Sequence, residues 1–145
     1  MSQLFSPIKL ANLELANRIQ ISPMCQYSSD DGCANDWHTT HLGMMANSGA
    51  GLVVIEATHF ERAGRITHGC MGLYSDDNEA ALGRVIGHAK RIGTSKFCVQ
   101  LAHAGRKASS KRPWEGGTAL QAGDDPWETL APSALPFGNG WHVPR

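Results

Sequence analysis

The segment Leu52-Val53-Val54-Ile55-Glu56-Ala57 is the strongest indication of the architecture. It is a nearly continuous apolar run, which is typical of a strand buried on both faces of a parallel sheet. Residues 36–47 before it and 77–92 after it predict helices. The second helix has apolar residues at i, i+3 and i+4 spacing, with Gly93 directly after its end. The pattern therefore indicates an α/β fold built from alternating strands and helices.

Two more strands complete the alternation, at residues 19–22 and 97–101. Residues 8–10 and 13–15 alternate apolar and polar side chains and predict a β-hairpin in front of them. The order is hairpin, β, α, β, α, β, which implies parallel pairing with right-handed crossovers. Because so few units leave sheet edges uncovered, we expect a fragment, or one piece of a larger assembly.

Length, charge and cysteine count exclude several classes of protein. The 145 residues carry no net charge and no basic run, so no nucleic-acid partner is expected. The longest apolar run is too short to span a bilayer, and the first residues do not resemble a signal peptide. The four cysteines are irregularly spaced. We therefore expect a cytoplasmic protein with free thiols and no membrane partner.

Polar side chains follow each predicted strand, in residues 23–27, 56–59 and 100–106. In parallel βα folds, ligands bind at the carboxyl ends of the strands. Pro23 cannot donate to a sheet ladder and should mark the end of the first strand, which places Cys25 and Tyr27 beyond it. The alternative is that these strand ends are polar only because they reach water.

The same segments resemble, in order along the chain, the Old Yellow Enzyme family, and specifically its branch with Cys in place of Thr on the first strand. The resemblance covers nearly the whole chain and rests on these motifs: Asn17-Arg18-Ile19, Ser22-Pro23-Met24-Cys25-Gln26-Tyr27-Ser28, Gly51-Leu52-Val53-Val54-Ile55-Glu56-Ala57-Thr58, Gly64-Arg65-Ile66-Thr67, Gln100-Leu101-Ala102-His103-Ala104-Gly105-Arg106-Lys107-Ala108 and Ala131-Pro132-Ser133-Ala134. It implies that residues 1–145 form the N-terminal part of a single (β/α)8 TIM barrel, preceded by the hairpin.

The family resemblance also implies a cofactor and a reaction. The cofactor is FMN, reduced by NAD(P)H, and the reaction is ping-pong reduction of activated C=C bonds in enones, with nitro compounds and nitrate esters as further substrates. The full-length protein is expected to be a homo-oligomer. The family's phosphate site, proton donor and substrate-oxygen pair match no residue of this chain, so residues 1–145 alone are expected to be inactive.

Roles for individual residues follow from the same resemblance. Pro23 and Met24 would line the flavin ring through their backbone, and Cys25 would lie beside its N5 and O4 edge. Ala57 would offer its backbone to the ring. Gln100 would hydrogen-bond the pyrimidine portion, which suits a carboxamide because it both donates and accepts.

Tyr27 would hydrogen-bond the activating carbonyl of the substrate. Cys25 and Tyr27 are thus the predicted catalytic residues. A competing reading makes Cys25 a covalent nucleophile, although no neighbouring His in the sequence would activate it.

For the remaining sequence patterns we favour an interpretation in which the residues serve the fold. His38 and His41 lie three apart on a predicted helix and, with Cys25 and Cys33, superficially resemble a zinc site. The cysteine spacing is too wide for one, so no metal is predicted. We interpret His103 as a loop histidine and Arg106 as a surface arginine, and not as residues that contact the cofactor. The irregular residues 104–142, with Trp114, Trp127 and Trp141, form either part of a lid or a satellite apolar cluster.

Two functional rivals remain at this point. One is a flavin-free (β/α)8 enzyme such as an aldolase, which absorbance of the purified protein would distinguish. The other is a metal-stabilised module without enzymatic activity, which metal analysis with and without a chelator would distinguish.

Overall fold

The structure is a computed structural model and describes residues 2–145. A three-stranded parallel sheet runs through it in the order β3-β4-β5. Its strands are β3 (Gln20–Ile21), β4 (Leu52–His59) and β5 (Lys96–Ala102). All three are parallel, so the predicted alternation of strands and helices is confirmed.

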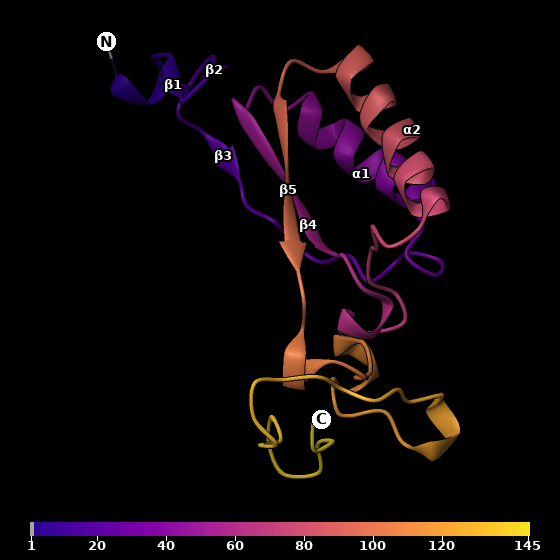
Figure 1. Cartoon of the computed structure of the whole chain (residues 1–145). Helices are drawn as coiled ribbons and strands as arrows, with labels where there is room; N and C mark the ends of the chain where they lie inside the picture. Colours follow the sequence, from indigo (N-terminus) through magenta and orange to yellow (C-terminus); the bar gives the residue numbers. More distant parts are fainter. Residues whose placement is uncertain (1) are drawn as a thin grey trace.

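Two helices cover one face of this sheet, α1 (Asp36–Ala46) and α2 (Asp76–Ile92), as Figure 1 shows. The core between the sheet and the helices is apolar because alternate strand residues and one stripe of each helix point into it. The buried members of this core are Ala34, Leu42, Val53, Ile55, Met71, Ala81, Leu82 and Val85.

The N-terminal hairpin forms as predicted. β1 (Ile8–Leu10) and β2 (Leu13–Leu15) pair antiparallel, and Ala11 in the connecting turn has a positive φ of 49°. They make a sheet of their own, separate from the parallel one.

Both helices begin at side chains that cap them. The Asn35 side chain accepts a hydrogen bond from the Trp37 amide at the start of α1, and Ser75 accepts from Asn78 at the start of α2. α2 begins one residue earlier than predicted, and α1 ends at Ala46, one residue earlier than predicted. Among residues 2–145, no helix combines the length and the hydropathy that crossing a bilayer requires.

The predicted C-terminal end of β4 was wrong. Thr58 and His59 do not follow β4 but belong to it, paired with Leu101 and Ala102, and both are fully buried. Thr58 Oγ1 donates to the Glu56 carbonyl at 2.9 Å, and His59 Nδ1 lies 3.0 Å from the Met71 carbonyl, whereas His59 Nε2 is buried without a partner among residues 2–145. A polar residue can therefore lie within a buried strand when the backbone beside it satisfies it.

The other differences are smaller. β3 is shorter than the predicted 19–22, and β5 is one residue longer at each end than the predicted 97–101. Residues 104–142 contain no α-helix or strand, as expected. Residues 2–145 also form five 3₁₀ turns, at Gln3–Phe5, Arg62–Gly64, Gly105–Lys107, Pro113–Glu115 and Ala122–Asp124.

Candidate functional site

The carboxyl edge of the sheet brings Ala57 and Gln100 side by side, because they are register partners on β4 and β5. The register shifts between Ile55 and Ala57, so Glu56 forms a β-bulge. Val99 packs against the helices and Gln100 is exposed, so the Gln100 side chain lies on the opposite face of the sheet. Because Gln100 is exposed, its carboxamide can both donate to and accept from a ligand.

The segment after β3 lies against this edge. It carries Cys25, whose thiol lies close to the Ala57 backbone and to the Tyr27 side chain, since each of these contacts affects a pKa at the site. The structure therefore brings together three of the six predicted site residues, Cys25, Tyr27 and Ala57. Gln100 lies beside Ala57, because the two are register partners. A thiol, a phenol and an exposed carboxamide thus border one patch of the sheet edge.

The Cys25 thiol keeps its proton. Burial, with smaller contributions from the charges of Cys70 and Glu56, raises the pKa of Cys25 from an ordinary 9.0 to about 11. A covalent nucleophile needs a thiolate at neutral pH. The raised pKa therefore argues against Cys25 as a nucleophile and in favour of a weakly hydrogen-bonding thiol.

The Tyr27 phenol also stays protonated. Burial is the largest cause that raises its pKa, followed by the neighbouring Cys25 and Cys70. A phenol that keeps its proton is a hydrogen-bond donor, which is what an activating interaction with a carbonyl oxygen requires.

Trp114 and Gly69 lie next to Tyr27, and no sequence pattern predicted either contact. The Trp114 ring packs edge-on against the Tyr27 ring, with centroids 5.8 Å apart and planes at 80°. A side chain at Gly69 would collide with the Tyr27 carbonyl. Both neighbours come from irregular segments, where no periodicity could have signalled the contact.

Pro23 and Met24 lie between β3 and Cys25, both at least partly exposed. The Met24 carbonyl accepts a hydrogen bond from Gln26 Nε2 at 2.8 Å. Their predicted contact with a flavin ring through the backbone stays a prediction.

His38 serves the fold through both ring nitrogens. Its Nδ1 accepts from the Asn35 amide at 3.1 Å, and its Nε2 lies 3.4 Å from Ser29 Oγ and 3.6 Å from Glu56 Oε1. Cys33 instead accepts from Asn78 Nδ2 at 3.2 Å. Within residues 2–145, no group of three or more His, Cys, Asp or Glu side chains is arranged to hold a metal ion.

His103 and Arg106 have structural partners, in line with the reading favoured from the sequence. His103 Nδ1 accepts from the Gly105 amide at 3.0 Å, and Arg106 Nη2 donates to Ser133 Oγ at 2.9 Å. Both interactions shape the loop after β5.

The three tryptophans of the irregular segment do not form one lid. Trp114 contacts Tyr27, whereas Trp127 donates to the Ala63 carbonyl at 2.9 Å and Trp141 packs on Phe137. Only Trp114 therefore lies at the candidate site.

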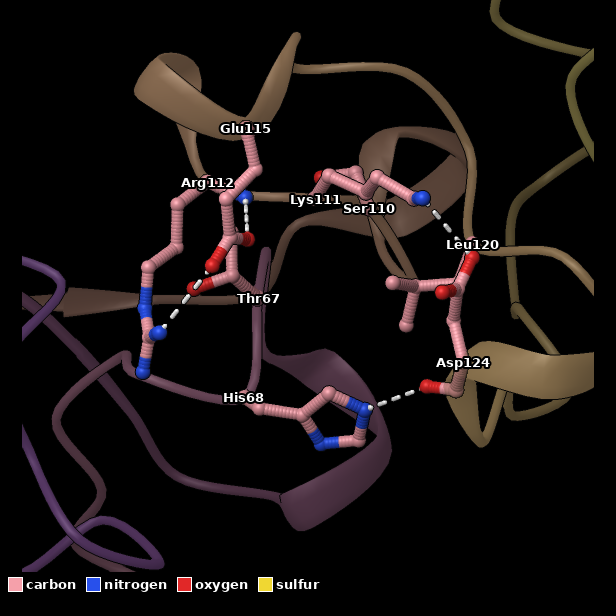
Figure 2. A pocket seen from close by; sticks show the side chains of 8 residues that line it. All are labelled: Thr67, His68, Ser110, Lys111, Arg112, Glu115, Leu120 and Asp124. Carbon is pink, nitrogen blue, oxygen red and sulfur yellow. Dashed lines mark hydrogen bonds and ion pairs between the residues drawn. The ribbon is translucent and has the colours of Figure 1, made fainter.

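A separate hollow of about 270 Å³ opens between residues 67–68 and the segment 110–124, as Figure 2 shows. Its charged groups are already paired: Lys111 Nζ lies 3.0 Å from Asp124 Oδ2, and Arg112 Nη1 lies 3.2 Å from Glu115 Oε1. None of the predicted site residues lines it.

Comparisons with known proteins agree on one family. The family model of the NADH:flavin oxidoreductase / NADH oxidase family matches residues 3–130. The chain is 41% identical over 137 residues to an NADH:flavin oxidoreductase of Gibberella zeae, covering 92% of this chain and 33% of the relative. It is 42% identical over 139 residues to an NADPH dehydrogenase of Listeria monocytogenes, covering 94% of this chain and 36% of the relative. The chain thus spans about a third of the length of these relatives.

Solved structures give the same result for the fold. Morphinone reductase superposes with a TM-score of 0.76 at 27% identity, over 98% of this chain and 38% of that one. Old Yellow Enzyme from Pichia superposes with a TM-score of 0.74 at 28% identity, over 92% and 32%. The fold is therefore the N-terminal part of an Old Yellow Enzyme TIM barrel, as predicted. The chain belongs to the NADH:flavin oxidoreductase / NADH oxidase family, the family of Old Yellow Enzyme.

Proposed function

We propose that the protein carrying this chain is an FMN-dependent NAD(P)H oxidoreductase that reduces the activated C=C bonds of enones, with nitro compounds and nitrate esters as further acceptors. The observation that carries the proposal is the patch at the sheet edge, where Cys25 meets Ala57 and Tyr27, and Gln100 lies beside Ala57. When bound, FMN accepts a hydride from NAD(P)H and delivers it to the acceptor.

The residues present fit an isoalloxazine ring. Such a ring has a polar edge that needs donors and acceptors, and the exposed Gln100 carboxamide offers both. The protonated Cys25 thiol offers a soft, weak donor beside the Ala57 backbone. Cys25, Ala57 and Gln100 would hold the ring.

Tyr27 would act on the acceptor. Its protonated hydroxyl would donate to the carbonyl oxygen of an enone and withdraw electron density from the C=C bond. Reductant and acceptor would use the site in turn, which gives a ping-pong order.

Two comparisons support the nicotinamide as reductant. Relatives of this chain are named NADPH dehydrogenase and NADH:flavin oxidoreductase. Morphinone reductase, 25% identical to this chain, has been solved in complex with tetrahydroNAD.

The test uses the protein as purified. Its visible spectrum should show bound flavin, and NADH or NADPH should bleach that spectrum in an anaerobic stopped-flow experiment. Mixing the reduced protein with 2-cyclohexenone should restore the oxidised spectrum, whereas saturated cyclohexanone should not. A protein that holds no flavin, or that reacts with both ketones alike, contradicts the proposal.

A further inference from the structure

The segment that carries Cys25 and Tyr27 depends on its neighbours for its shape. β3 ends at Ile21, and residues 22–29 have no helix or strand of their own. Tyr27 has a positive φ of 52°, in the left-handed region that residues with a side chain rarely adopt. Such a conformation persists only where the surrounding structure holds it in place.

Hydrogen bonds hold this segment on both sides of Tyr27. Before it, the Gln26 amide donates to Glu56 Oε2 at 2.9 Å. After it, Asn35 Nδ2 donates to the Ser28 carbonyl at 2.7 Å, and the Ser29 amide donates to the Gly69 carbonyl at 2.9 Å. Glu56 is the only one of these partners that anchors the side next to Cys25.

The position of Glu56 in the sheet allows it to accept this hydrogen bond from the Gln26 amide. It is the bulged residue of β4, and it is only 5% exposed. Its other oxygen, Oε1, lies 3.6 Å from His38 Nε2 on α1. Among residues 2–145, it is the only Asp or Glu in the buried set. Burying a carboxylate is costly, so one that is kept and hydrogen-bonded points to a specific role.

The same carboxylate acts on the predicted catalytic groups electrostatically. It raises the pKa of Cys25 and of Tyr27, in each case less than burial does. Two effects of Glu56 on the site therefore have to be separated. One is the hydrogen bond that it accepts from the Gln26 amide, which depends on the length of its side chain, and the other is its charge.

We propose that Glu56 is a positioning residue of the flavin reaction, which acts by accepting the Gln26 N–H and so fixes Tyr27 where its hydroxyl meets the acceptor. This inference rests on the proposed function. It makes the β-bulge of β4 part of the site rather than an irregularity of the sheet.

Two conservative variants separate reach from charge. Glu56→Gln keeps the length of the side chain and an acceptor oxygen for the Gln26 amide, and the Nε2–H of His38 keeps Ser29 Oγ within 3.4 Å as an acceptor. Glu56→Asp keeps the charge but is one methylene shorter, so it draws the carboxylate away from the Gln26 amide. Glu14→Gln, on the exposed hairpin strand β2, is the matched control for the loss of a carboxylate.

The measurement is stopped-flow kinetics of both half-reactions in the flavin-loaded protein, with thermal unfolding recorded for each variant. Glu56→Gln should reoxidise with 2-cyclohexenone at a rate within threefold of the wild type. Glu56→Asp should slow that step tenfold or more and change reduction by NAD(P)H less than threefold. Glu14→Gln should change neither step.

Three results would overturn the inference: wild-type rates in both Glu56 variants, equal slowing of both half-reactions, or a slow Glu56→Gln with a normal Glu56→Asp. If Glu56→Asp does not fold, Glu56→Gln decides alone, since a tenfold loss confined to the oxidative half would assign the role to the charge. The wild type is measured first. If it does not react with the enone at all, the proposed function fails; if it does, and only the Glu56 variants behave unexpectedly, the inference fails alone.

Discussion

Cys25 shows how burial changes the chemistry of a single side chain. Its pKa of about 11 means that the folded protein binds this proton more tightly than the unfolded chain does, whose ordinary value is 9.0. The stability that Cys25 contributes is therefore complete below about pH 9 and is lost as the pH rises towards 11.

Alkylation of Cys25 by iodoacetamide should follow the same shift. In protein without flavin, we expect its rate to rise about tenfold per pH unit from pH 7 to 10 without levelling, because the thiolate fraction is still small at pH 10. At neutral pH the rate should be about a hundredfold below that of a small thiol with a pKa near 9. Mass spectrometry of the peptide carrying Cys25 measures this, and a plateau above pH 9 would contradict the shift.

Tyr27→Phe tests the residue that would meet the acceptor. The change keeps the ring against Trp114 but removes the hydroxyl. Losing one such hydrogen bond should cost about 1–3 kcal/mol, or roughly ten- to hundredfold in the rate of flavin reoxidation by an enone. Reduction by NAD(P)H should change much less.

Tyr74→Phe is the matched control, because the other tyrosine of the chain hydrogen-bonds to Asp31 at 3.3 Å and is not part of the candidate site. It should leave both half-reactions unchanged. Equal slowing of both halves by Tyr27→Phe would indicate a general effect on the fold, and no effect on either would remove Tyr27 from the site.

At the scale of elements, the two helices approach each other through glycine. A side chain at Gly93, directly after α2, would collide with the backbone of Ala46 at the end of α1. Gly93→Ala should therefore force the helix ends apart and destabilise the protein by about 1–3 kcal/mol. Gly83→Ala, on the exposed side of α2 with open space around it, should stabilise by about 0.5–1 kcal/mol.

Urea unfolding of both glycine variants gives the two free energies directly. Both substitutions add one methyl group, so changes of opposite sign in the free energy of unfolding would reflect the space around each glycine. A Gly93→Ala protein as stable as the wild type would mean that the helix ends can separate without cost.

The caps of the two helices have different consequences for the site. Asn35 caps α1 and also donates to the Ser28 carbonyl beside Tyr27, whereas Ser75 only caps α2. Asn35→Ala and Ser75→Ala should each lower the free energy of unfolding by about 1 kcal/mol. Only Asn35→Ala should also slow flavin reoxidation by the enone, and similar kinetics in both variants would show that the Ser28 contact does not matter.

Sequence patterns predicted the elements well where periodicity is strong. The apolar run around Val53 and Ile55 identified β4, and the stripe of α2 identified the helix that covers it, because both patterns follow from burial on a fixed face. The predicted end of β4 was wrong because Thr58 and His59 are polar, yet backbone carbonyls lie within hydrogen-bond distance of Thr58 Oγ1 and His59 Nδ1. Polarity alone does not mark the end of a strand.

Much of the candidate site was beyond such patterns. Cys25, Tyr27, Ala57 and Gln100 were predicted because parallel strands end at one edge and because of the family resemblance. The neighbours Trp114 and Gly69 come from irregular segments, and the anchoring role of Glu56 follows from a β-bulge. Contacts of that kind depend on tertiary packing, which leaves no period in the sequence.

At the scale of the whole molecule, the sheet has one covered face and one open face. α1 and α2 cover the first (Figure 1). On β5, the residues that alternate with the core-facing Phe97 and Val99 are exposed, namely Lys96, Cys98 and Gln100. A flavin placed at this face by residues 2–145 alone would keep much of its surface in water, whereas bound ligands usually bury roughly 70–90% of theirs.

Residues 1–145 alone should therefore bind FMN with a Kd above about 10 µM, which corresponds to less than about 7 kcal/mol of binding free energy. Equilibrium dialysis measures the Kd, and circular dichroism on the same sample establishes that α1 and α2 are formed. Submicromolar binding by the folded segment would show that Cys25, Ala57 and Gln100, with their neighbours, suffice to hold the cofactor. Weak binding that Gln100→Leu weakens further would instead locate the flavin at the open face, because that change removes the exposed carboxamide there and nothing from the core.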